Sequence, residues 1–221
     1  MSANAPAAHP ALQRPLLRGY FHLLAAGAAI AGLVVLVLLA DSARAYVGGA
    51  VFAGSLVLLY FTSGTYHTIN WGRRMSSFLK RLDHSMIFVL IGGTYTPFCL
   101  LVLNDAWGLS MLSVIWGVAA AGILLKLIWP GAPRWFGVIL YAGAGWMAVV
   151  AGAPLSDWFD FTPLLLLVLG GVLYTIGGVT YALRRPDPFP RVFGYHEVFH
   201  LLVIAGSAVH YTLVAVYLMP A

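Results

Sequence analysis

The sequence predicts an all-α polytopic membrane protein, a bundle of seven transmembrane helices with a cytoplasmic N-terminus and an outside C-terminus. Three observations lead to this class. First, the 221 residues are 61% hydrophobic and only 9% charged, whereas soluble domains carry about 25% charged residues. Second, seven apolar runs approach the roughly 20 residues that a helical crossing needs. Third, the basic residues alternate between successive loops. A water-soluble globular domain is therefore excluded.

The predicted spans are separated by short breaker segments rich in Pro, Gly, Asn and Asp. They are placed at residues 19–40, 45–69, 82–103, 107–129, 134–153, 161–183 and 195–218. Residues 1–18 are predicted to form a flexible N-terminal tail, and residues 19–221 a single transmembrane domain. The paired Gly92 and Gly93 inside the third span favour close helix packing. Cys99 is the only cysteine, which excludes an intramolecular disulfide and a cysteine-rich zinc site.

The distribution of basic residues sets the predicted orientation. All 12 Lys and Arg residues except Arg44 fall on one side of the predicted membrane. Basic loops stay in the cytoplasm, so the N-terminus is predicted inside and the C-terminus outside. The net charge of +5 therefore reflects membrane orientation, and no nucleic-acid partner is expected.

Polar residues from distant parts of the chain are predicted to meet in one layer of the membrane. His67 ends the second span, Asp83 opens the third, and His196 and His200 open the seventh one turn apart. The alternating topology places all four near the cytoplasmic side. Ionisable groups in a membrane-length apolar segment are costly and face the protein interior. Neutral imidazoles with an oxygen in the fourth position suit zinc, so His67, His196 and His200 are candidate ligands.

The other polar residues of these spans have simpler interpretations. His9, His22, His84 and His210 are expected to be hydrogen-bonding or interfacial histidines, although His22 lies at a similar depth to the candidate ligands. His210 shares a helix face with His196, His200 and Ser207, but it lies about 15 Å beyond His200, too far to share one ion. Asp83 could instead pair with the nearby Arg81, and Ser63 could bond a carbonyl of its own helix.

The segment His196-Glu197-Val198-Phe199-His200 also has the form H-E-x-x-H. On a helix this pattern is typical of zinc metalloproteases, in which the glutamate is the general base. A protease would need a third ligand, and His67 or Asp83 would have to supply it from upstream. The alternative for Glu197 is a solvent-facing acid or an acid at the start of the helix.

Several motifs together resemble a known family. They are Ser63-x-x-x-His67, LDHSMIF at residues 82–88, GTYTPF at 93–98 and FGYHEVFH at 193–200. In this order and spacing they resemble the hemolysin III family, the bacterial branch of the progestin and adiponectin receptor superfamily. The resemblance implies a seven-helix bundle with an intramembrane zinc ion held by His67, His196 and His200. Asp83 would hold a water at the zinc, and Ser63 would support that network.

The resemblance also implies a multi-pass protein of the bacterial inner (plasma) membrane that acts in membrane lipid homeostasis. Our first hypothesis is a zinc-dependent hydrolase of a lipid amide or ester, with Asp83 accepting the proton of the attacking water and Ser63 assisting. Its partners would be membrane lipids, including a substrate with an acyl chain. The alternatives are a non-enzymatic sensor of membrane state with structural zinc, the H-E-x-x-H metalloprotease, and a cytolysin, as the family name suggests. A secreted pore former would need a water-soluble form that seven apolar spans do not permit.

Overall fold

The structure is a computed structural model that describes residues 15–103, 105–129 and 131–219. The described chain is built of helices, seven of which are long and apolar enough to cross a membrane. This confirms the predicted fold class and number of spans. In chain order the elements are α1 (Tyr20–Leu39), α2 (Ala43–Thr68), α3 (Arg73–Leu101), α4 (Asp105–Ile128), α5 (Arg134–Gly145), η1 (Trp146–Ala151), α6 (Gly152–Trp158), α7 (Phe161–Leu183), α8 (Tyr195–Leu213) and η2 (Val214–Leu218).

Two spans differ from their predicted bounds. Helix α3 begins at Arg73, nine residues before the predicted start at 82, because its first turns are charged and add little hydropathy yet form helix readily. The fifth span is not one helix: α5 ends at Gly145 and continues as the 3₁₀ segment η1 before α6. The Tyr95 hydroxyl of α3 donates to the Gly145 carbonyl at 2.6 Å and accepts from the Ala148 amide at 2.6 Å. These bonds supply partners to backbone groups at the break.

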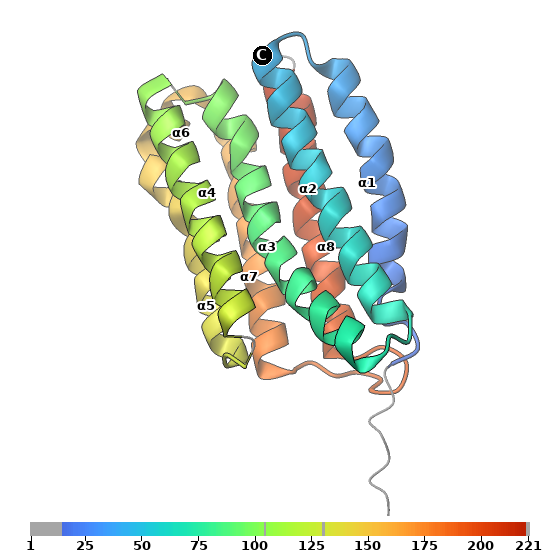
Figure 1. Ribbon diagram of the computed structural model, residues 1–221. Coiled ribbons are helices and arrows are strands. Elements are labelled where there is room, and N and C mark those ends of the chain that lie inside the picture. Colours follow the sequence, from blue (N-terminus) through green and yellow to red (C-terminus); the bar gives the residue numbers. More distant parts are fainter. Residues whose placement is uncertain (1–14, 104, 130, 220–221) are drawn as a thin grey trace, which may run out of the picture.

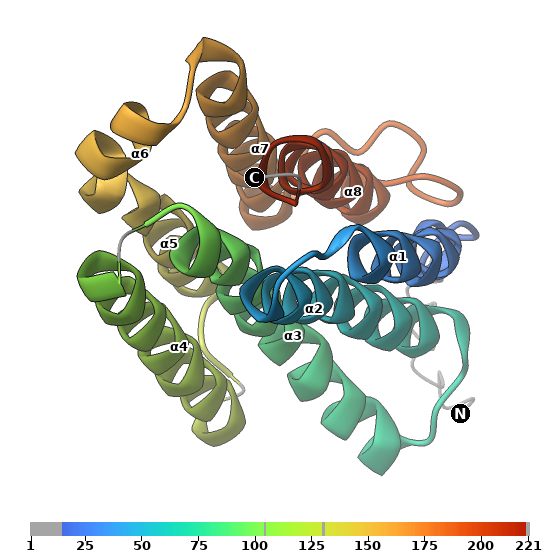
Figure 2. The same cartoon turned by 90° about the horizontal axis from the view of Figure 1, so that it is seen from above.

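The helices pack as an ordered bundle (Figures 1 and 2). Helix α2 lies between α1 and α3, α4 packs on the outer side of α3, and α8 packs against both α7 and α1. Gly93 of α3 faces Ser55 of α2, and a Cβ at position 93 would collide with the Ser55 side chain. The predicted close packing at this glycine is therefore confirmed. The arrangement leaves α3, α5, α7 and α8 around a common interior.

The start of the chain packs against the loop between α7 and α8. Of the predicted tail, residues 1–18, the first 14 lie outside the described residues. Beyond them, the backbone amides of Leu16 and Leu17 donate to the carbonyls of Arg191 and Val192. The two ends of the described chain lie at opposite ends of the bundle (Figure 1), as an odd number of crossings requires.

The outward surface of the bundle is apolar. Large aliphatic and aromatic side chains point away from the core along several helices, with Leu24, Leu38 and Phe161 each more than 70% exposed. Exposed apolar surface on this scale is unfavourable in water but matches the hydrocarbon core of a bilayer. The chain is therefore an integral, multi-pass membrane protein.

Candidate metal centre

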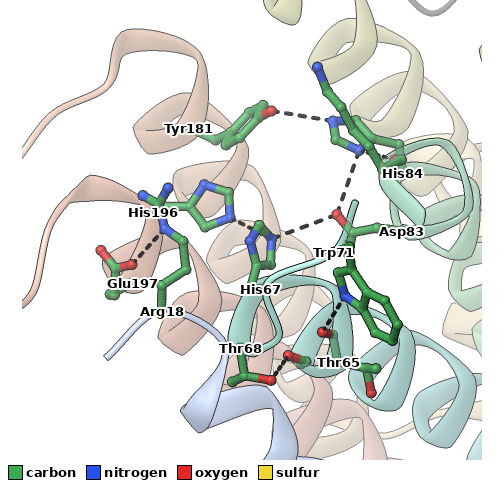
Figure 3. A network of polar contacts seen from close by, with 12 residues as sticks. Arg18, Thr65, His67, Thr68, Trp71, Asp83, His84, Tyr181, His196 and Glu197 are labelled. Carbon is green, nitrogen blue, oxygen red and sulfur yellow. Dashed lines mark hydrogen bonds and ion pairs between the residues drawn. The ribbon is translucent and has the colours of Figure 1, made fainter. Parts of the chain in front are cut away.

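Three histidine side chains from two helices converge beneath one end of the bundle. His67 lies in the last turn of α2, and His196 and His200 lie in the first two turns of α8. One ring nitrogen from each lies within 4.8 Å of the other two. The Nε2 atoms of His67 and His196 are 3.2 Å apart and point toward one another (Figure 3). Two nitrogens on one tetrahedral zinc, each at about 2.1 Å, would be about 3.4 Å apart.

The burial of the cluster also fits a cation-binding site. His200 is 1% exposed, and its Nδ1 is buried without a hydrogen-bond partner among the described residues. Leaving such a nitrogen without a partner costs about 1–3 kcal/mol. A cation held by the cluster would stabilise unprotonated imidazoles here. Imidazoles beside a carboxylate are a donor set that could hold a metal ion, and zinc is commonly bound by such ligands.

The carboxylate beside the cluster belongs to Asp83 of α3. Its Oδ2 lies 3.8 Å from Nε2 of His67 and 3.6 Å from Nδ1 of His84. The side chain of Ser63, one turn before His67 on α2, interacts with the Asp83 carboxyl group. The structure thus brings together all five predicted site residues, from α2, α3 and α8. Their roles as ligands, base and support remain predictions.

His84 is held by two hydrogen bonds. Its Nδ1 lies 2.8 Å from the Lys80 carbonyl and its Nε2 lies 3.3 Å from the Tyr181 hydroxyl. Because a carbonyl oxygen only accepts, Nδ1 carries the hydrogen and Nε2 accepts from Tyr181. The expected hydrogen-bonding role of His84 is confirmed.

The His22 ring of α1 lies directly against the histidine cluster, a contact that its position in the sequence did not indicate. Its ring stacks on that of His200 with 3.7 Å between centroids and 11° between planes. His22 is 2% exposed, and neither ring nitrogen has a hydrogen-bond partner among the described residues. It is therefore buried inside the bundle against His200, and the expectation of an interfacial position is wrong. Its position in the first span indicated that it lies at the depth of the cluster. The spacing of residues in the sequence could not predict that α1 contacts α8.

Glu197 faces away from the histidines and is fully buried. It accepts a hydrogen bond from the Gly194 amide at 2.7 Å. It accepts another from Nε of Arg18 at 3.0 Å (Figure 3). The solvent-facing alternative for Glu197 is wrong, because Arg18 and the chain before α1 cover it. The alternative of an acid at the start of the helix is confirmed, since Glu197 satisfies a backbone donor that precedes α8.

His210 lies apart from the cluster, near the other end of α8. His210 bonds the Leu167 carbonyl through Nε2 at 3.1 Å, in agreement with its expected hydrogen-bonding role. His9 lies outside the described residues.

The site opens into a cavity of about 370 Å³ within the bundle. The cavity is lined mainly by apolar side chains of α3, α5, α7 and α8, together with Ser63, Asp83, His22, His196 and His200. Two of its lining residues, Ile139 of α5 and Val179 of α7, are also exposed on the outer surface. The cavity therefore reaches the lipid-facing side of the bundle between α5 and α7. An apolar chain could enter it from the bilayer.

Together, the fold and the site define a seven-helix integral membrane protein with a buried three-histidine cluster at the head of an apolar cavity. The family model described as "Haemolysin-III related" matches residues 11–211. The chain belongs to this family, and the resemblance seen in its motifs is confirmed.

Known relatives cover most of the chain. It is 33% identical over 202 residues to Hemolysin-3 of Bacillus cereus, a match that spans 90% of this chain and 89% of that protein. It is 34% identical over 191 residues to the Hemolysin-3 homolog of Bacillus subtilis (strain 168), covering 85% and 86% of the two chains. It is also 32% identical over 182 residues to the Adiponectin receptor protein of Drosophila melanogaster. That match covers 74% of this chain but 40% of the receptor.

Proposed function

We propose that this protein is a zinc-dependent hydrolase of lipid amide or ester bonds that acts in membrane lipid homeostasis in the bacterial inner membrane. One observation carries the proposal. Three imidazoles that can hold a metal lie beside a carboxylate, and this group sits at the head of an apolar cavity that reaches the lipid-facing surface. A metal site and an acyl-chain cavity in one continuous space suit a reaction on a lipid substrate.

His67, His196 and His200 would hold the zinc ion. A bound zinc ion supplies a water of lowered pKa and a Lewis acid for a carbonyl oxygen. Asp83, 3.8 Å from the His67 nitrogen, would accept a proton from the attacking water and return it to the leaving amine or alcohol. Ser63 would hold the Asp83 carboxyl group in place. The products are a fatty acid and the amine or alcohol of the lipid, so one water is consumed for each bond cleaved.

The cavity would select the substrate by its acyl chain. The surface of its lining is predominantly apolar, so a charged or strongly hydrated molecule would lose its solvation on entering. A ceramide-like or acylated lipid can instead leave its headgroup near the membrane interface while its chain enters between α5 and α7. The acyl chain would also exclude bulk water from the site.

The proposal is tested with purified protein in lipid nanodiscs. We expect about one zinc per chain in the wild type and loss of zinc in His67→Ala, His196→Ala and His200→Ala. We expect Asp83→Asn to retain zinc and to lower the hydrolysis of ceramide-like substrates by about 10²–10⁴-fold, the range for removal of a general base. Asp157→Asn, an exposed carboxylate at the other end of the bundle, is the matched control and should leave hydrolysis unchanged. Undiminished turnover in zinc-loaded Asp83→Asn would contradict the assigned role.

A second candidate is a non-enzymatic regulator of membrane state with a structural zinc ion. The observation that favours it is the same short distance from Asp83 to His67, since a carboxylate this close could complete a four-coordinate site. A closed site of four protein ligands is structural. It predicts that chelation of zinc lowers the thermal stability of the bundle and that zinc-loaded wild type hydrolyses no lipid amide or ester. The experiment above therefore separates the two candidates.

A further inference from the structure

A second polar cluster lies deeper in the bundle than the metal centre. It consists of Tyr174 on α7 with Ser207 and His210 on α8. His210 follows His200 by ten residues, which is about 15 Å along a helix. Tyr174 and His210 line the same cavity as His196 and His200 of the metal centre. The two polar groups of residues are thus joined by one largely apolar space.

His210 presents an unused acceptor. Its Nε2 lies 3.1 Å from the Leu167 carbonyl, which only accepts, so Nε2 carries the hydrogen and Nδ1 is unprotonated. This Nδ1 is buried and has no hydrogen-bond partner among the described residues, and the side chain is 5% exposed. Gly170 of α7 makes room for the ring, because a Cβ at position 170 would collide with the imidazole. The backbone of α7 is thus shaped to hold His210 against it.

The hydroxyl groups beside His210 hold a spare donor. The Tyr174 hydroxyl and the Ser207 Oγ are 2.8 Å apart, and Tyr60 of α2 reaches the same serine. Three hydroxyl groups carry three hydrogens, and two hydrogen bonds link them in a row, so one hydrogen is left over. The cluster therefore offers one free donor and one free acceptor. Their complement is a group that can both donate and accept, which is a hydroxyl group.

We propose that Tyr174 and His210 form a deep subsite that binds a hydroxyl group on the acyl chain of a lipid whose head lies at the metal centre. The inference rests on the proposed function for the position of the lipid head, and it deepens that function by naming the substrate class: lipids with a mid-chain hydroxyl. In this largely apolar cavity the cluster offers such a hydroxyl both a donor and an acceptor, and an unsubstituted chain leaves His210 Nδ1 without a partner. The hydroxyl could also come from a resident water, and the experiment below separates the two sources.

The test is competition binding in lipid nanodiscs, with displacement of a fluorescent fatty acid by stearic acid and by its hydroxylated isomers. The isomers carry the hydroxyl near the carboxyl group, at mid-chain or near the methyl end, so they are matched in size and polarity. We expect the mid-chain isomer to bind about three- to tenfold tighter than the other two, the gain from satisfying otherwise unpaired groups. Tyr174→Phe and His210→Phe keep an aromatic ring at each position and should abolish this preference.

Tyr211→Phe is the control variant, because its hydroxyl donates to the Gly32 carbonyl outside the cavity lining. It should keep the full preference. Equal binding of all isomers would mean that a resident water fills the subsite and would overturn the proposal, as would a preference that persists in both variants. If the mid-chain preference is found but no lipid is hydrolysed, the subsite stands and the hydrolase function fails. If hydrolysis is found without the preference, the subsite alone fails.

Discussion

At the scale of single residues, the stack between His22 and His200 sets this cluster apart from a plain three-histidine site. A face-to-face contact with 3.7 Å between ring centroids restricts rotation of the His200 ring. His67 also packs against His196, with ring centroids 4.6 Å apart. Supported ligand rings need less reordering when a metal binds, and partners of this kind commonly tune metal affinity. We therefore predict that His22 acts as a positioning residue for His200.

We predict that His22→Ala weakens zinc binding, whereas His22→Phe largely retains it. Aromatic pairs contribute about 0.5–1.5 kcal/mol beyond their buried area, so the alanine variant should lose about two- to tenfold in zinc affinity. Competition with a chromophoric chelator measures the affinity of each variant. If the phenylalanine variant loses as much affinity as the alanine variant, the ring nitrogens of His22 matter and stacking is not its role. Thermal unfolding of both metal-free variants controls for loss of the fold.

The sequence predicted the site at this scale only in part. His67, Asp83, His196 and His200 were predictable because alternating spans place particular ends of helices in one layer, whatever the packing. The stack of His22 and the link from Tyr174 to Ser207 depend on which helices are neighbours and how they are rotated. A single sequence carries little information on either property. Residues whose chemistry depends on a neighbour across the bundle were therefore not identified.

At the scale of elements, the start of α8 is fixed by Glu197 and not by the histidines. Glu197 accepts from the Gly194 amide at 2.7 Å, and Arg18, before α1, donates to it at 3.0 Å. The Glu197 side chain is fully buried, and the Arg18 side chain is 19% exposed. This contact ties the beginning of the first helix to the beginning of the last. Through α8 it also holds His196 and His200 in place.

We predict that Glu197→Gln leaves zinc content unchanged and any lipid hydrolysis within about threefold of wild type, because the amide oxygen can still accept from Gly194. Glu197→Ala removes the acceptor and should lower the free energy of unfolding by about 1–3 kcal/mol. Zinc analysis, turnover and thermal unfolding on the two variants measure these effects. A zinc-loaded Glu197→Gln protein without activity would instead support the H-E-x-x-H alternative, in which Glu197 is the general base.

A comparison of the predicted and observed helix bounds shows what a hydropathy pattern can detect. The seven runs were found because burial in a membrane requires length and apolar composition. The break after Gly145 was not found, because Tyr95 on another helix stabilises it through bonds to Gly145 and Ala148. The early start of α3 was not found either, because hydropathy detects the membrane and not the helix itself.

At the scale of the whole molecule, charge is strongly polarised along the bundle. The described basic residues lie at the end that holds the first residues of α1, α3, α5 and α8, and Arg44 is the exception at the start of α2. The histidine cluster lies at the same end, in the last turn of α2 and the first turns of α8. The positive-inside rule predicts that this end faces the cytoplasm. Zinc would then reach the cluster from the cytoplasmic side.

We predict that cysteines placed in loops at the two ends react with opposite sides of the membrane. In a Cys99→Ala background, Asp41→Cys should react with a membrane-impermeant maleimide in intact spheroplasts. Gly72→Cys, at an exposed glycine with open space around it, should react only after the membrane is permeabilised. Both positions lie outside the seven long helices, so neither change should disturb the bundle. The reverse labelling pattern would place the histidine cluster on the outer side of the membrane, because the two loops lie at opposite ends of α2 and His67 lies at the end next to Gly72.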